Sequence, residues 1–503
     1  MSRPRVADQQ QNFSGGLNSV ASELNMGATQ VRTLSNALLS QYGDVIRRGG
    51  TQRLMSSALA AEVRNGFCWR TATTHEYLAA CNGRLWSAGS YALPMNWNDR
   101  GALTSETAYP DFAAFRDSSG EVCYIADGAL FKYSAGVKSA VAGVPALTRV
   151  AVYNQRLFGI TGADQTIHYS DLNNGDTCGV ASATSGSAVV RTFSNQKLTG
   201  LLALSGSLAM FHVSGVSRFV GLTQDDIAIG AGLNGISTDT GTIAPRSAIG
   251  VEGQGYFLSE RGAFRINDSG VQALDSPQSP DPTRALLAIL SASLFPQIDA
   301  VHDKVNGTIR WYIPDVGVYV YAYRLNAWSG PHSGIFTSTP THTLFDGIDN
   351  NGEPILLSGH ADGYVRRNET TSYLDDVLSS GSGGSAYPMT VKCRRFYTAI
   401  PSGDKAWRWA SLQADLQGSS SCVLAWASES GASQYTITPP SGGPVVWGGT
   451  TWDASVWVGT GNRAYRIPLS KRGPYLDLTI TDSSATRTIL SRVDIDAFDY
   501  GRR

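Results

Sequence analysis

A recurring hairpin pattern between residues 70 and 370 limits the fold of this chain more than any other feature. Each repeat has an apolar strand, a tight turn that contains glycine, and a second strand. Asn-Gly and Asp-Gly turns between alternating strands are strong short-range signals of a β-hairpin. Neighbouring turn glycines lie 34 to 55 residues apart, about 47 on average, which is the length of one four-stranded propeller blade. The turn glycines are Gly83, Gly128, Gly162, Gly215, Gly262, Gly317 and Gly363.

This spacing predicts an all-β fold built around a β-propeller of six, or alternatively seven, blades. An isolated hairpin is marginally stable and has to pack its apolar face on neighbouring strands. Radial repetition provides those neighbours and leaves few exposed edges. Seven hairpins fit six blades with a strand exchange that closes the ring, or they fit seven blades, and we expect six. A row of separate β-sandwiches is the alternative that the same strand spacing permits.

The composition favours a large, soluble all-β protein. The 503 residues include 54 glycines and 10% aromatic residues, which is typical of many short strands joined by tight turns. A formal charge of −1 argues against a surface designed to hold nucleic acid. The opening MSRPRVADQQQ has no apolar signal core, and the longest apolar run, 285–295, is too short to span a bilayer. We therefore expect neither secretion through a cleaved signal nor membrane insertion.

The cysteines occur singly, without a C-x-x-C pair. In a protein made in a reducing cytoplasm, isolated cysteines of this kind are typically buried free thiols. We expect no disulfide among them. The six cysteines are Cys68, Cys81, Cys123, Cys178, Cys393 and Cys422.

Four segments follow from the pattern along the chain. Residues 1–69 form an N-terminal arm and the first strands, 70–378 the propeller, 379–385 (SSGSGGS) a flexible linker, and 386–503 a C-terminal domain. Six of the eleven tryptophans follow the linker, where alternating strands predict a compact antiparallel β-sandwich. Within the propeller segment, Asp281 opens an apolar stretch that Pro296 ends, so we expect a helix there.

The first 50 residues are polar and rich in glutamine, serine, asparagine and glycine. Such a segment cannot offset its own ordering entropy, which is about 1–2 kcal/mol per residue. We therefore expect an extended arm that becomes ordered only through contacts with a neighbour. That neighbour is an adjacent subunit of an assembly, or another ring of subunits that lies above it. Its apolar residues are the expected inter-subunit anchors, and they are Val31, Leu34, Leu38 and Leu39.

No motif predicts a catalytic, cofactor-binding or metal-binding residue. A G-x-G-x-x-G motif at 230–235 leads into β-branched residues and Pro245 instead of the helix that a dinucleotide site requires. The seven histidines show neither H-x-H nor H-x-x-x-H spacing. The S-x-D-x-G-x-x-W turns that sialidase-type propellers usually repeat are absent. Basic pairs are assigned to surface or interface salt bridges, and they are Arg47-Arg48, Arg366-Arg367, Arg394-Arg395 and Arg502-Arg503.

Several stretches resemble the nozzle, or packaged-DNA stabilisation (tail hub), proteins of short-tailed bacteriophages. The resemblance covers nearly the whole chain and depends on the order and spacing of blade-type patterns, none of which is specific alone. The stretches are NFSGGLNSVASELN from Asn12, NQRLFGITGADQTIHYSDL from Asn154, YFLSERGAFRI from Tyr256, YVYAYRLNAWS from Tyr319 and DIDAFDYGRR from Asp494.

The resemblance implies a non-enzymatic structural protein of the virion tail, assembled in the host cytoplasm. Such proteins form a ring, by resemblance a homohexamer, below the portal and the head-to-tail adaptor, and the ring retains and then passes genomic DNA. The implied partners are further copies of the chain, adaptor proteins, tail fibres or spikes, and genomic DNA that passes through the lumen without sequence specificity. No cofactor or small-molecule substrate is implied. The alternatives are a carbohydrate-active propeller enzyme and a receptor-binding tail-tip adhesin.

Overall fold

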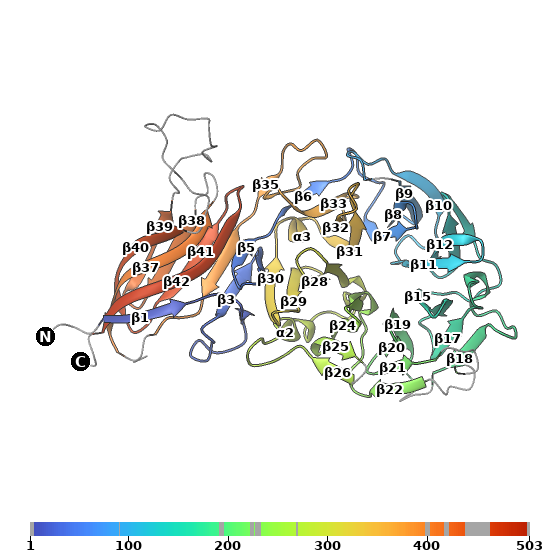
Figure 1. Ribbon diagram of the computed structural model, residues 1–503, viewed down its shortest axis with the longest axis horizontal. Coiled ribbons are helices and arrows are strands. Elements are labelled where there is room, and N and C mark those ends of the chain that lie inside the picture. The colour runs from blue at the N-terminus through green and yellow to red at the C-terminus, as the bar shows by residue number, and fades with distance from the viewer. Residues whose placement is uncertain are drawn as a thin grey trace.

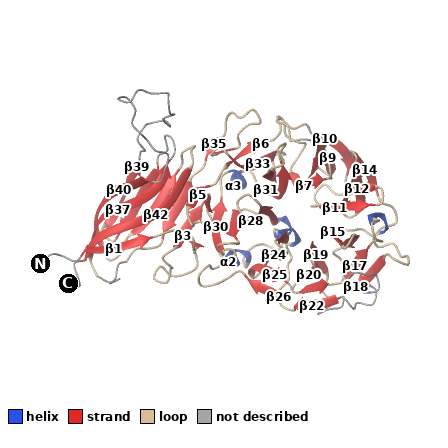
Figure 2. Ribbon diagram, viewed as in Figure 1, coloured by secondary structure: helices blue, strands red, loops and turns tan. Residues whose placement is uncertain are grey.

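The computed structural model describes residues 5–89, 91–190, 196–221, 226, 233–267, 270–397, 403–416, 422–437 and 463–499. It is nearly all-β and consists mostly of four-stranded antiparallel sheets, so the expected all-β, propeller-like class is confirmed. Figure 2 shows the helices as short isolated turns between strands. In this part of the chain no helix is long and apolar enough to cross a membrane.

Seven four-stranded units follow one another along the chain, and in each unit sequence neighbours pair. The first three are β7 (Val63–Arg70), β8 (His75–Cys81), β9 (Arg84–Ala88) and β10 (Asn98–Ala102); β11 (Asp111–Asp117), β12 (Gly120–Ala126), β13 (Leu130–Ser134) and β14 (Val137–Ala140); and β15 (Arg149–Tyr153), β16 (Arg156–Ile160), β17 (Thr166–Tyr169) and β18 (Gly186–Val189).

The next three units complete most of the series. They are β19 (Leu198–Ala203), β20 (Leu208–His212), β21 (Val216–Phe219) and β22 (Leu233–Ser237); β23 (Ile249–Val251), β24 (Gln254–Ser259), β25 (Gly262–Asn267) and β26 (Gly270–Ala273); and β27 (Asp299–Asp303), β28 (Thr308–Ile313), β29 (Gly317–Ala322) and β30 (Ala327–His332). The seventh unit has β31 (Thr341–Ile348), β32 (Pro354–His360), β33 (Val365–Thr370) and, as its fourth strand, β6 (Gly50–Arg53) from the N-terminal segment.

These units form a closed cycle. The first strand of each unit contacts the first strand of the next, and β31 of the seventh unit contacts β7 of the first. Figure 1 shows the units arranged around a ring. All seven turn glycines lie at the turn between the second and third strands of a unit, so the hairpin predictions are confirmed. Gly83 and Gly128 adopt positive φ, as these tight turns require.

Beside the ring lie two further antiparallel sheets (Figure 1). One contains β4 (Ala37–Leu39), β5 (Val45–Arg47), β42 (Thr488–Asp499), β37 (Lys405–Leu416), β40 (Arg463–Gly473) and, on β42, β1 (Arg5–Gln10). The other continues the sixth unit from β30 through β3 (Gln30–Ser35), β36 (Met389–Cys393), β41 (Asp477–Asp482), β38 (Cys422–Ser428) and β39 (Gly431–Ile437), with β2 (Gly16–Leu17) parallel to β3. A ten-stranded sheet therefore runs from the ring into the C-terminal region.

The two further sheets share one apolar core. Alternate residues of their strands point inward, as the burial pattern of β37 shows. Trp407 and Leu412 of the first sheet lie in the same buried cluster as Leu424 and Ile480 of the second. That cluster continues to Trp311 in the sixth unit, so the core is not interrupted between the ring and the C-terminal region.

The expected N-terminal arm is wrong for the described residues 5–53, which form β1 to β6 within the chain's own sheets. Val31, Leu34, Leu38 and Leu39 are at most 7% exposed and belong to intramolecular clusters, so they offer no free surface to another subunit. The physical reason is that local composition does not show which strands pair. Strand β3 of this polar segment pairs with β36, which lies far along the sequence. Hydrogen bonding and burial inside the chain offset the ordering entropy.

Two smaller expectations also change. The predicted helix is a single turn, α2 (Arg284–Leu287), followed by turns and the 3₁₀ turn η3 (Phe295–Gln297). The intervening serines favour local turns over helix, and Ile289 is 83% exposed, so the apolar residues do not form one helical face.

The expected linker, residues 379–385, forms most of an exposed loop and ends at the first residue of β35 (Ser385–Ala386). This loop joins β35 to the short strand β34 (Leu374–Asp375), with which β35 pairs.

The remaining short elements lie between units. They are η1 (Gly175–Thr177), η2 (Pro245–Ser247) and α3 (Ile335–Ser338).

The substitution Leu34→Ala tests whether the N-terminal segment belongs to the core. Because Leu34 is fully buried, we expect the free energy of unfolding to fall by about 2–5 kcal/mol. Leu24, in the same segment but 66% exposed, provides the matched control, and Leu24→Ala should change stability by less than about 0.5 kcal/mol. Urea unfolding followed by tryptophan fluorescence measures both. Equal, small effects of the two substitutions would contradict this placement.

Candidate functional site

The segment IRRGGTQR, residues 46–53, lies where the sixth unit, the seventh unit and the C-terminal region meet. Strand β5 ends at Arg47 and β6 begins at Gly50, so Arg48 and Gly49 form the whole link between β5 of the C-terminal sheet and β6 of the ring. We call the residues that surround this connection the closure junction. It brings together side chains from β28, β33, β34 and β41.

Arg48 is the centre of the closure junction. Its Nη1 and Nη2 donate to the two carboxylate oxygens of Asp375, at 2.9 and 2.6 Å, and both side chains are at most 3% exposed. Its Nε donates to Asn36 Oδ1 at 3.0 Å, and Nη2 also donates to the carbonyl of Ser333. The guanidinium lies 3.7 Å from the centre of the Tyr387 ring. Burial opposes the charge of Arg48, but Asp375, Tyr387 and Glu369 together outweigh it and raise the pKa of the guanidinium.

The two glycines that follow Arg48 are required by close backbone contacts. A Cβ on Gly49 would lie 2.6 Å from the Cα of Glu369, and one on Gly50 would lie 2.0 Å from the carbonyl oxygen of Leu374. Neither distance is tolerated by a real Cβ, and the atoms that it would meet are backbone atoms, which cannot move aside as a flexible side chain could. The Arg-Arg-Gly-Gly sequence therefore combines two long cationic side chains with two positions that have no side chain.

Arg47 points to the other side, into the C-terminal region. Its Nη1 lies 3.5 Å from Asp482 Oδ2 and both side chains are fully buried. Its Nη2 donates to the carbonyl of Tyr387 at 2.5 Å, and its guanidinium lies 4.7 Å from the Tyr387 ring. Tyr387 thus packs against both arginines.

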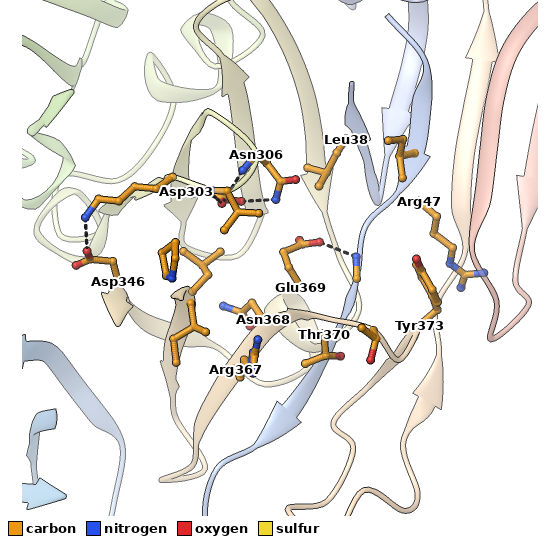
Figure 3. A pocket seen from close by; sticks show the side chains of 18 of the residues that line it. Leu38, Arg47, Asp303, Asn306, Asp346, Arg367, Asn368, Glu369, Thr370 and Tyr373 are labelled. Atoms are coloured by element: carbon orange, nitrogen blue, oxygen red, sulfur yellow. Dashed lines mark hydrogen bonds and ion pairs between the residues drawn. The ribbon is translucent and has the colours of Figure 1, made fainter. Parts of the chain in front are cut away.

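A second buried arginine, Arg310 of β28, joins the sixth and seventh units. It donates to Asp303 at 2.5 Å and to Glu369 at 2.6 Å. Glu369 also accepts from the backbone N–H of Gly49 at 2.6 Å, as Figure 3 shows. Burial works against the ionisation of Asp303, yet Arg310 and the donors of Asn306 lower its pKa. Asp303 and Glu369 are both held as hydrogen-bonded acceptors.

The pairing of β6 with β33 has its own ionic contacts. Asp376 accepts from Arg53 of β6 and from Arg366 of β33, and Arg366 also pairs with Asp362. Arg366 has a fully buried side chain, and His360 of the neighbouring strand is fully buried as well. Burial, together with the charge of Arg366, lowers the pKa of His360 to about 3.

A cavity of about 360 Å³ opens at the closure junction (Figure 3). The sixth unit contributes residues 302–306, and the seventh unit contributes parts of β31 to β33. The N-terminal segment contributes Leu38, Ile46, Arg47 and Gly49. Tyr373 and Arg487 complete the wall on the side of the C-terminal region. In Figure 3 the paired Asp303 and Asn306 lie on one side and Arg47 and Tyr373 on the other.

A second polar cluster lies among the first strands of the ring. Arg246, from η2, donates to Asp299 Oδ2 at 2.6 Å, to Asn65 Oδ1 at 3.4 Å and to the carbonyl of His342 at 3.0 Å. Its guanidinium lies 4.5 Å from the Tyr109 ring. Burial raises the pKa of Asp299, and Arg246 works against that rise. The Arg246 side chain, which lies just before the first strand of the fifth unit, therefore contacts the first, sixth and seventh units.

Neither cluster has the features of a catalytic or metal centre. Asp299 accepts from Arg246 and from the backbone N–H of Leu344, and Asp303 and Glu369 are bound by Arg310. These carboxylates therefore accept hydrogen bonds from arginine and backbone donors that join separate parts of the fold. Within the described residues no group of three His, Cys, Asp or Glu side chains could hold a metal ion.

The residues singled out in the sequence are placed as follows. Of the G-x-G-x-x-G motif, Gly230 and Gly232 lie outside the described residues and Gly235 lies in β22. All six cysteines are buried free thiols, and burial raises the pKa of Cys393 and Cys422 to about 12. The inter-subunit anchors lie in the core, as described above, although Leu38 also lines the cavity.

The assignment of Arg47-Arg48 to surface or interface salt bridges is wrong, and so is that of Arg366. These side chains are buried because each finds a carboxylate partner far along the sequence, and such pairs cannot be recognised by local composition. One feature of the sequence could have indicated that these arginines are buried. Gly-Gly directly follows Arg-Arg, which indicates that another segment of backbone comes close at that point. Arg394 and Arg395 pair with Asp8 and Asp477, and Arg502-Arg503 lies outside the described residues.

Comparisons with known proteins identify no family. No protein-family model matches the chain, and no curated protein matches it. Among solved structures, a chain of the mitotic checkpoint complex matches with a TM-score of 0.40 and 11% identity, covering 67% of this chain and 92% of that one.

Two sensor structures from B. thetaiotaomicron are also similar. The extracellular domain of a putative one-component system matches with a TM-score of 0.45 and 10% identity, over 82% of this chain and 58% of that chain. The extracellular domain of a putative hybrid two-component system matches with a TM-score of 0.43 and 12% identity, over 72% and 48%. This chain thus spans about half the length of those two sensor chains.

We expect Arg48→Ala to lower the free energy of unfolding by about 3–5 kcal/mol, because it leaves Asp375 buried without its partner. The matched control is Arg324→Ala, since Arg324 forms an ion pair with Glu252 at 3.0 Å but is 70% exposed. The control should change stability by less than about 1 kcal/mol. Guanidinium unfolding curves measure both, and a small effect of Arg48→Ala would show that the closure junction contributes little.

His360 predicts a specific pH dependence of stability. The pKa of folded His360 is about 3, whereas that of an unfolded histidine is about 6.5, so between these values the unfolded chain binds the proton. His360 therefore makes the protein less stable as the pH falls below about 6.5, by up to about 1.4 kcal/mol per pH unit. Urea unfolding near pH 7 and pH 5 should show a steeper loss for the wild type than for His360→Gln. Parallel losses would contradict the assignment.

Proposed function

We propose that this chain is a structural virion protein that forms a ring, the nozzle or hub, in the tail of a short-tailed bacteriophage. In this proposal the seven units are the blades of one β-propeller, closed by β6, and the two further sheets form a β-sandwich. The count of seven replaces the six blades that we expected from the sequence. Six copies make the ring by resemblance, with adaptor proteins and tail fibres or spikes as neighbours.

The observation that carries the proposal is the continuous connection between the ring of units and the C-terminal region. A ten-stranded sheet, a shared core cluster and the buried pair Arg48–Asp375 join them. Multidomain enzymes and receptors commonly use mobile domain interfaces, whereas a conduit under mechanical load requires subunits that keep one shape. A rigid, two-lobed subunit is suited to heterologous contacts that repeat by rotation and close a ring.

The charge balance supports the same proposal. A channel for moving DNA should not bind phosphate strongly along its wall, because each phosphate that is neutralised adds affinity. The chain has a formal charge of −1, and only seven of its cationic residues are lysine. Several of its arginines are buried inside the fold, among them Arg47, Arg48, Arg310 and Arg366.

The carbohydrate-active alternative receives less support. A glycosidase needs two carboxyl groups that flank a substrate and are free to act as acid and base or nucleophile. At the two polar clusters described above, the acids are bound by arginine and backbone donors.

The assembly of the purified full-length chain tests the proposal. We expect native mass spectrometry to detect a hexamer, and negative-stain images to show rings with a central opening wider than one subunit's propeller. Purified protein that remains monomeric both alone and with its adaptor would count against a ring. Hydrolysis of a glycan by the same preparation would favour the enzymatic alternative.

A further inference from the structure

The outer face of one C-terminal sheet is hollowed by a groove that takes no part in the closure junction. Four neighbouring strands form this part of the sheet, in the order β1, β42, β37 and β40, at the end of the molecule away from the ring (Figure 1). The groove has a volume of about 670 Å³. We call it the outer groove, and its main polar and aromatic side chains are those of Gln9, Trp409, Ser411, Arg466, Arg492 and Asp494.

Strand register places four of these side chains in one row across the sheet. Gln9 of β1 lies opposite Asp494 of β42. Asp494 lies opposite Ser411 of β37, and Ser411 lies opposite Arg466 of β40. Residues directly opposite each other on paired strands share one face of the sheet, so all four side chains face the outer groove. Neighbouring strands lie about 4.8 Å apart, so the row crosses roughly 14 Å of the sheet surface.

Small side chains beside a large ring make this face hollow. The residues that alternate with the outward positions, such as Leu412 and Val493, lie in the apolar core. Among the outward positions, Trp409 is followed two residues later by the short side chain of Ser411. In the register of Trp409, Ala7 lies two strands away on β1. The space beside the indole is therefore left open.

The row presents hydrogen-bonding atoms that the described part of the chain does not use. Arg492 donates from Nε to Asp494 Oδ1 at 2.7 Å and from Nη2 to Gln9 Oε1 at 2.8 Å. Within the described residues, Gln9 Nε2, Asp494 Oδ2 and Ser411 Oγ form no hydrogen bond, and all three atoms are accessible to solvent. They are a donor, an acceptor and a hydroxyl that can act as either. Arg492 fixes the orientation of two of the three side chains.

Trp409 adds an apolar surface to the same groove. Its side chain is half-buried and lies two residues before Ser411 on the same face of β37. The guanidinium of Arg466 lies 4.4 Å from the centre of the Trp409 ring, so it holds the ring in place. An indole beside a row of polar groups offers one apolar and one hydrogen-bonding surface to a single ligand.

The charges of the outer groove balance. Arg466 and Arg492 are matched by Asp494 and Asp496, and the third acid, Asp8, forms an ion pair with Arg394. No excess of one sign attracts a strongly charged ligand. A sugar fits this chemistry, because its hydroxyl groups donate to carboxylates and accept from amide and guanidinium groups. Its C–H face is apolar and packs against an indole.

We propose that the outer groove binds a neutral oligosaccharide. Trp409 is the surface on which a sugar ring packs, and the row from Gln9 to Arg466 supplies the hydrogen-bonding partners. The volume of about 670 Å³ is within the range of ligand sites, and the row is longer than a single sugar ring. The inference concerns binding and not hydrolysis, and it does not depend on the function in a phage tail.

An array of immobilised neutral and acidic oligosaccharides, probed with the labelled full-length protein, tests the site. Calorimetric titration with the neutral oligosaccharide that is bound best then measures its affinity. We expect saturable binding by the wild type, and binding at least about tenfold weaker in Trp409→Ala. Ser411→Tyr should weaken binding to the same extent, because it fills the groove with a residue that strands accept readily.

The matched control is Tyr435→Ala. Tyr435 is an aromatic residue of β39 in the other C-terminal sheet, is 48% exposed, and does not line the outer groove. This variant should bind as the wild type does. Unfolding curves without oligosaccharide check that each variant is folded, and Ser411→Tyr decides the outcome if Trp409→Ala does not fold. Absence of binding to neutral oligosaccharides, binding restricted to acidic ones, or binding that both groove variants retain unchanged would overturn the site.

Discussion

The buried pair of Arg48 and Asp375 is the interaction on which the rest of the structure depends. Removing two charges from water costs several kcal/mol, and a buried pair is stable only when every donor finds an acceptor. The acceptors of Arg48 come from four places in the chain: Asn36, Gly49, Ser333 and Asp375. These segments have to be in place together, so closing the ring and attaching the C-terminal region become one event.

This arrangement gives the N-terminal segment a role that its composition conceals. Its strands contribute to both C-terminal sheets, and its last strand, β6, completes the seventh unit. The chain therefore folds as one body in which the first 53 residues hold the other parts together. The continuous sheet and the shared core connect the ring to the C-terminal region, which is the arrangement that the proposed tail ring requires.

The cavity beside the closure junction is a consequence of the same geometry. Three structural elements meet there at an angle, and the glycines at positions 49 and 50 bring their backbones close without filling the space alongside. The polar residues that build the junction also line this space.

The sequence by itself determined the local repeat. Turn chemistry at Gly83, Gly128 and the equivalent glycines acts between neighbouring strands, so the seven hairpins and the all-β class could be read from residue types and spacing. Only the tertiary structure decided what closes the ring and where the buried charges lie. Leu34 pairs with Val391 and Arg48 with Asp375, partners separated by more than 300 residues, and no local pattern specifies such contacts. The physical reason is that burial and ion pairing depend on which surfaces meet in space, whereas hairpin formation depends on the chain within a few residues of each turn.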